Sequence, residues 1–144
     1  MSVAVHSLVA ADQIYQDIQS GKFILSGTFH SIRVPELPCT LPYQLNVYTA
    51  LSGVTSKTKL EYRIVYSHAP EKVQSFDIEI APPAQGTFTD FHVGLSPVTL
   101  LDSGKMELQL CDAYNQVLGN TYFIIESGSI QPAQGLKKIL SDSI

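Results

Sequence analysis

Apolar and polar residues alternate along most of this chain. The segment KLEYRIVY at residues 59–66 is the clearest case, because every second residue from Leu60 to Tyr66 is apolar and these residues alternate with the charged Lys59, Glu61 and Arg63. Alternation with a period of two is typical of a β-strand that buries one face. The same pattern predicts strands at residues 3–10, 22–31, 43–51, 76–80, 90–95, 105–112 and 121–125.

About eight short strands, separated by turn residues at intervals of roughly 8 to 14 residues, predict two packed antiparallel sheets. Each strand then contributes one apolar face to a shared core. In 43–51 the predicted inward residues are Tyr43, Leu45, Val47 and Leu51. The segment 121–125 is apolar on both faces, as in a central strand or one covered by another segment. We therefore predict an all-β, immunoglobulin-like, two-sheet sandwich over residues 1–126.

Three prolines, Pro35, Pro38 and Pro42, interrupt this pattern. Proline has no backbone N–H to donate to a sheet, so the preceding strand should end at about Val34. The fixed φ of proline keeps the chain extended without pairing, which favours a crossover from one sheet to the other. A recognition loop is the alternative, because loops on a rigid sandwich often carry binding.

Two segments do not alternate clearly. Residues 11–20 place Ile14 and Ile18 four apart behind Asp12, which allows one or two helical turns or a long loop. The tail 127–144 has a linker-like start and a short stretch of helical spacing, so it could be a docked helix or a frayed terminus. Within the predicted strands, Gly27 and Gly94 suggest bulges or a close approach of another chain segment.

Composition narrows the classes of partner. The 144 residues fit one domain, and only 15% of them are charged, with 9 basic and 13 acidic residues and a net charge of −4. Without a basic stripe, nucleic acid and anionic membrane surfaces are not expected as partners. The N-terminus lacks a positive n-region, and Cys39 and Cys111 are too few for a disulfide framework. We expect a cytoplasmic protein without a disulfide or a cofactor.

The candidate chemistry is sparse. Asp90 and His92 share one face of a predicted strand, where a carboxylate and an imidazole could hold a metal or move a proton, but no third ligand is evident. Cys111 beside Asp112 lacks the electropositive surroundings of a reactive thiol, so it is interpreted as structural. No motif of a hydrolase, a phosphate-binding loop or a dinucleotide site is present. The sequence therefore predicts a protein that is not an enzyme.

Outward apolar residues favour a protein-binding or assembly module. Ile24, Tyr48, Val65 and Phe88 fall on faces that should be solvated, and a cluster of them would mark a partner surface. Unpaired edge strands provide a second route to self-association.

A small-ligand module, for example one for carbohydrate, is the alternative function. It would use the loops 35–42 and 112–116 as lips if they share one end of the sandwich. Tyr43 and Tyr114 would then supply stacking faces.

The opening run ADQIYQD, the turn SGK and the segment FILSGTFHSIRVPELP resemble the start of small bacterial β-sandwich domains of unknown function. The later stretches GKMELQLCD and YFIIE are similar to the closing hairpin of those domains. The resemblance spans about residues 3–126. It implies an immunoglobulin-like sandwich in the cytoplasm and carries no assigned catalytic or binding residue.

Overall fold

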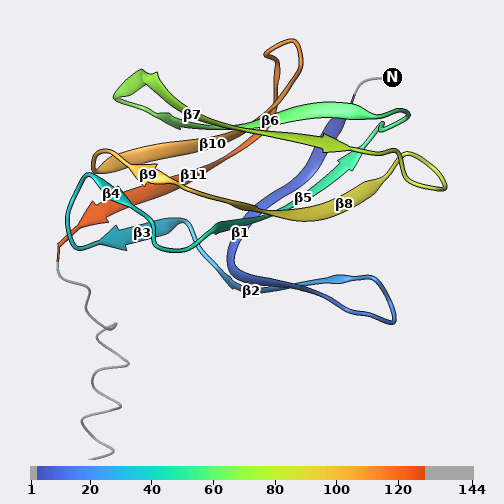
Figure 1. The fold of residues 1–144 in the computed structure, drawn as a ribbon, viewed down its shortest axis with the longest axis horizontal. Coiled ribbons are helices and arrows are strands. Elements are labelled where there is room, and N and C mark those ends of the chain that lie inside the picture. Colours follow the sequence, from blue (N-terminus) through green and yellow to red (C-terminus); the bar gives the residue numbers. More distant parts are fainter. Residues whose placement is uncertain (1–2, 129–144) are drawn as a thin grey trace, which may run out of the picture.

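The computed structural model describes residues 3–128, which form strands and loops without a helix in that range (Figure 1). Within these residues, no segment is therefore a helix that could span a membrane. The strands are β1 (Ala4–Gln16), β2 (Phe23–Thr28), β3 (Ser31–Val34), β4 (Cys39–Thr40), β5 (Leu45–Ser52), β6 (Thr58–Tyr66), β7 (Ala69–Ile80), β8 (Thr89–Leu95), β9 (Thr99–Leu100), β10 (Gly104–Asp112) and β11 (Val117–Ser127).

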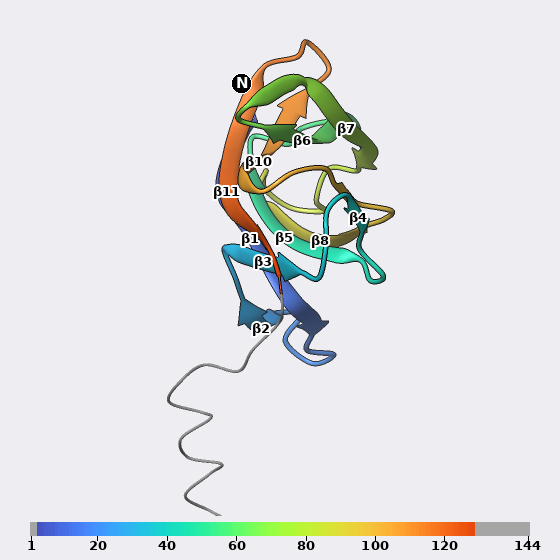
Figure 2. The same cartoon turned by 90° about the vertical axis from the view of Figure 1, so that its left-hand side faces the viewer.

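Two sheets make the body of the protein. Sheet A has the order β2-β1-β5-β8, and sheet B has the order β3-β11-β10-β6-β7, while β4 and β9 form a small separate pair. All neighbours are antiparallel except β3 and β11, which run parallel. Figures 1 and 2 show the sheets as two facing layers. The predicted β-sandwich is confirmed, although the segment expected as one strand at 22–31 divides into β2 and β3.

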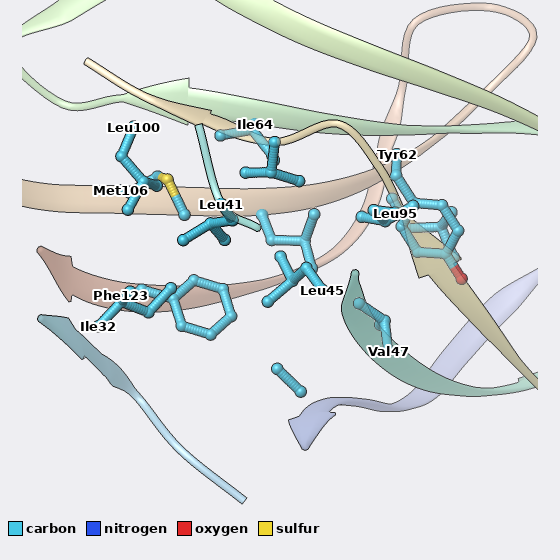
Figure 3. Close-up of a cluster of buried hydrophobic side chains, with 14 of the residues drawn as sticks. Ile32, Leu41, Leu45, Val47, Tyr62, Ile64, Leu95, Leu100, Met106 and Phe123 are labelled. Carbon is cyan, nitrogen blue, oxygen red and sulfur yellow. The ribbon is translucent and has the colours of Figure 1, made fainter. Parts of the chain in front are cut away.

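The core fills the space between the layers (Figure 3). The alternating residues of β6 are buried as predicted, and they share one cluster with apolar side chains of β10 and β11 in their own sheet and of β5 in the opposite sheet. Thr49 of β5 is the one buried polar residue among those described, and its hydroxyl lies 2.6 Å from the hydroxyl of Tyr62 in β6. Because each hydroxyl satisfies the other, this hydrogen bond joins the two sheets without leaving a polar group unpaired.

The proline segment is the crossover that the sequence predicted. β3 ends at Val34 in sheet B, and the chain enters sheet A at Leu45. The expectation that this segment stays unpaired is wrong at Cys39–Thr40, which form β4 and pair with β9. Between Val34 and Leu45, Leu41 is buried and its N–H donates to Val98 O at 2.8 Å. The segment is therefore anchored to the core.

Two expectations from the sequence are corrected, and one pair of alternatives is decided. Residues 11–16 are strand, neither helix nor loop, because Ile14 pairs with Leu25 of β2 in an antiparallel ladder, and Ile18 lies in the following turn. Tyr43 is 53% exposed, not inward, because β5 begins only at Leu45. Of the two alternatives for 121–125, the structure shows the central strand: β11 lies between β3 and β10, and Ile124 on its outer face is 47% exposed.

The two cysteines behave as expected. Cys39 and Cys111 are both free, and Cys111 is buried. Burial raises the pKa of the Cys111 thiol, and the positive charge of Arg63 partly opposes that shift. A structural role for Cys111 agrees with these surroundings. The predicted tail 127–144 lies outside the described residues, apart from its first two positions.

Candidate functional site

The β1–β2 hairpin forms a third layer outside the sandwich. After pairing with β5 as far as Ala11, β1 bends away from β5, and the hairpin folds back across the outer face of β5 and β8 (Figures 1 and 2). The ring centroid of Phe23 lies 5.4 Å from that of Tyr48 and 5.5 Å from that of His92. These aromatic contacts attach the hairpin to strands β5 and β8.

Gly27 allows the hairpin to close tightly at its root. Its φ is +71°, a left-handed conformation that favours glycine. A Cβ at this position would also lie 2.5 Å from the Asp12 carboxylate on β1. The sequence prediction of a bulge or close approach at Gly27 is therefore confirmed.

The outer side of the hairpin exposes apolar side chains. Tyr15 and Ile24 are direct cross-strand partners, and they are 51% and 54% exposed. Ile18 in the connecting turn is 98% exposed. Directly opposed side chains lie about 5 Å apart on one face, so Tyr15 and Ile24 form one apolar surface. We call these three residues the hairpin patch.

The edge strands differ in charge. Strand β2, with the sequence FILSGT, has no charged residue and has a free outer edge in sheet A. The other three edges of the two main sheets, among the described residues, each carry charge: Asp90 on β8, Arg33 on β3, and both signs on β7. Charged residues protect an edge against pairing with another chain, so β2 is the least protected edge.

The candidate polar pair of β8 is engaged within the protein. The hydroxyl of Tyr48 donates to Asp90 Oδ2 at 2.7 Å. Burial raises the pKa of Tyr48 to about 12, and this hydrogen bond is the second cause of the shift. His92 faces Phe23. Within residues 3–128, no group of three His, Cys, Asp or Glu residues is placed to hold a metal.

The outward apolar residues selected from sequence do not gather into one patch. Ile24 belongs to the hairpin patch, whereas Tyr48 is half-buried under Phe23. Val65 is half-buried on β6 of the other sheet, opposite Val73. Phe88 is 54% exposed and contacts His6 with ring centroids 6.1 Å apart. The sequence analysis missed Tyr15 and Ile18, since only the pairing of β1 with β2 shows which residues share a face.

The two loops proposed as lips lie at opposite ends of β11. Val34, at the start of the proline segment, pairs with Ser127, whereas the 112–116 loop immediately precedes Val117. Ten residues of strand span about 33 Å. Tyr114 is 89% exposed on the 112–116 loop, whereas Tyr43 directly follows the 35–42 loop, so the separation of the loops keeps the two rings apart. The proposed ligand site between these loops is therefore not formed.

The hollow beside the 112–116 loop has a volume of about 400 Å³, and three of the carboxylates that line it, Glu61, Glu79 and Asp112, are bonded to groups outside the lining. Asp112 Oδ1 accepts hydrogen bonds from the backbone N–H groups of Tyr114 and Gln116, both at 2.9 Å, and so shapes the loop. Glu61 accepts from Arg63 Nε at 2.6 Å, and Glu79 lies 2.8 Å from Lys57 Nζ. These three carboxylates therefore have structural partners already.

Comparison with known proteins places the chain in a family. The chain is similar in structure to an immunoglobulin-like protein from Pseudomonas aeruginosa, with 10% identity, a TM-score of 0.45, and coverage of 88% of this chain and 98% of that one. No curated protein matches it. Residues 6–114 match the family DUF6941, described as a family of unknown function. Because that match covers most of its length, the chain belongs to the DUF6941 family.

Proposed function

We propose that this protein is a non-enzymatic assembly module and that its partner at the β1–β2 hairpin is a second copy of the same chain. The observation that carries the proposal is the free, uncharged edge of β2 next to the hairpin patch. Unpaired N–H and C=O groups on such an edge can continue a sheet into another subunit. The apolar side chains beside the edge would gain from leaving water.

A second copy fits this edge better than an unlike partner. In a twofold interface the same surface occurs on both sides, so a charge near the axis meets its own copy. Like charges placed opposite each other destabilise a strand pair. β2 carries no charge and avoids this cost, whereas β7 would place Asp77 and Glu79 against identical carboxylates. Antiparallel pairing of two β2 strands would also bring the two hairpin patches together.

Light scattering after size-exclusion chromatography tests the proposal over a range of protein concentrations. The unaltered protein should form dimers, and Ile24→Lys should shift it to monomers, because a buried lysine in the centre of the interface is costly. Val73→Lys is the matched control. Val73 is an exposed apolar residue on the charged edge strand β7, at 44% exposure, so its replacement should leave the dimer intact.

Circular dichroism and thermal unfolding should show that both variants remain folded. A monomer at every concentration, or a dimer unaffected by Ile24→Lys, would contradict self-association through this edge. If the protein is monomeric and binds a different protein through this edge, that protein is the partner and the second copy is not.

A further inference from the structure

A cleft of about 550 Å³ lies at the root of the β1–β2 hairpin, on the outer side of sheet A. Its volume falls within the range of about 300–1,000 Å³ that is usual for small-ligand sites. The lining includes the polar side chains of Asp12, Gln13, Gln44 and Asn46 and the rings of Tyr43 and Phe29. It therefore combines one carboxylate and three amides with aromatic surface.

Existing hydrogen bonds leave both donors and acceptors free in this cleft. Gln13 accepts at its Oε1 from the hydroxyl of Tyr15, so its NH₂ remains available. Asn46 donates from Nδ2 to the backbone oxygen of Asp12 at 3.0 Å, so its Oδ1 remains available. These two residues offer one donor and one acceptor from neighbouring strands.

Gln44 adds a side-chain amide that packs on Gly94 and has no hydrogen-bond partner among residues 3–128. A Cβ at Gly94 would lie 2.2 Å from Gln44 Oε1, so the Gln44 side chain rests directly on the Gly94 backbone. Among residues 3–128, no hydrogen bond is made by the amide of Gln44 or by the side-chain oxygens of Asp12 and Tyr43. The absence of a side chain at Gly94 thus positions a free amide in the cleft.

The mixture of groups selects the kind of ligand. A hydroxyl both donates and accepts, which matches amides and a tyrosine hydroxyl. Among the described residues, no lysine or arginine lines the cleft, so an anion would meet Asp12 without a counter-charge from them. A cation would leave the amide NH₂ groups unpaired, which is unfavourable when they are desolvated. Burial raises the pKa of Tyr43, helped by the charge of Asp12, so its hydroxyl keeps its proton at neutral pH.

From this geometry we infer that the cleft binds a neutral sugar residue, with its hydroxyls on Gln44, Asn46 and Asp12 and one face of its ring against Tyr43. Aromatic rings supply a flat apolar surface that suits the C–H face of a pyranose. This site is distinct from the predicted one between the loops 35–42 and 112–116. It also differs from the free edge of β2 that self-association would use, although Gln13 of the cleft accepts a hydrogen bond from Tyr15 of the hairpin patch.

The test is an NMR titration of the full chain that follows the side-chain amide signals of Gln44 and Asn46. The probes are glucose, galactose, mannose and N-acetylglucosamine, with choline and glucose 6-phosphate as charged comparisons. At least one neutral sugar should give saturable shifts. Gln44→Ala should weaken that binding about tenfold, the effect of losing roughly one or two neutral hydrogen bonds.

Gly94→Ala should weaken sugar binding similarly by displacing the Gln44 amide, without touching the sugar. Gln116→Ala, which removes an exposed amide from the 112–116 loop, should leave the affinity unchanged. The inference would be overturned by no saturable shift with any neutral sugar, by binding of a charged probe alone, or by equal affinity in Gln44→Ala. Size-exclusion measured on the same samples keeps this result separate from the oligomeric state.

Discussion

Two hairpins of this protein are built from the same kind of alternating sequence and have different surroundings. In β6–β7, the inward residues of β6 lie fully inside the core, and the free edge of β7 carries charged residues of both signs. In the projecting part of β1–β2, Ile14, Phe23 and Leu25 are only half-buried, and the free edge of β2 is uncharged. The first hairpin stabilises the domain and resists pairing, whereas the second is exposed in a way that favours contact.

The difference comes from the number of layers that each hairpin contacts. β6 lies inside sheet B, between β10 and β7, and packs against sheet A, so every inward residue is covered. The β1–β2 hairpin lies on the outside of sheet A and is covered on one side only. Alternation therefore shows that a strand has two unlike faces, but it does not show whether the second face meets water or a partner.

The largest expected contrast comes from the same substitution in both hairpins. Ile64→Ala removes a fully buried side chain of β6 and should lower the free energy of unfolding by about 2–5 kcal/mol. Ile24→Ala shortens a side chain that is 54% exposed and should change the free energy of unfolding by less than about 0.5 kcal/mol. Urea unfolding at a concentration where the protein is monomeric measures both, and equal losses would contradict the comparison.

An intermediate effect is expected at high pH. Burial raises the pKa of Tyr62 on β6 to about 12, against an ordinary value of about 10. The unfolded state therefore loses this proton first, so the stabilisation is complete below pH 10 and is lost as the pH rises to about 12. A pKa difference of two units between the folded and unfolded states corresponds to roughly 3 kcal/mol of folding stability, which is the largest loss expected from this group.

The double variant Tyr62→Phe with Thr49→Val removes both hydroxyls of the pair, so neither is left unpaired. Its stability should be close to that of the parent at pH 7 and should fall less steeply between pH 10 and pH 12. Urea unfolding across that range is the measurement. An alkaline slope identical to that of the parent would show that Tyr62 does not control it.

Removing charge from the edge strand β7 should have the smallest effect on stability but a clear effect on association. Replacing Asp77 and Glu79 with threonine in the Ile24→Lys background removes two exposed charges from β7 and should alter the unfolding free energy by less than about 0.5 kcal/mol. The edge protection of β7 should be weakened, so light scattering should again detect assemblies. The control Glu36→Thr with Asp102→Thr removes the same charge from loops and should remain monomeric.

Much of the fold could be predicted from the sequence because most strands meet the core with one face. The segments around Leu60, Leu108 and Val93 alternate for that reason, and the prolines after Val34 mark the crossover. Residues 11–16 could not be assigned by the same rule. Ile14 faces sheet A and Tyr15 faces solvent, so adjacent apolar residues hide the alternation of this strand.

The candidate sites were harder to predict because they depend on register between distant strands. Tyr48 and Asp90 were each selected from sequence, but their hydrogen bond follows from the pairing of β5 with β8. The cleft at the hairpin root brings Asp12 to Asn46, and Gln44 to Gly94, through a bend in β1 and a glycine contact. No local pattern encodes either juxtaposition.

The parallel pairing of β3 with β11 has a consequence for how the chain is made. Within the described part of the chain, residues 31–34 join sheet B through residues 124–127 alone, which the ribosome adds some ninety residues later. Until then Ile32 and Val34 have no neighbouring strand in that sheet, and their apolar side chains stay open to unwanted contacts during synthesis. Closure of sheet B must therefore be a late event in biogenesis, and a nascent chain stalled before β11 would be prone to aggregate.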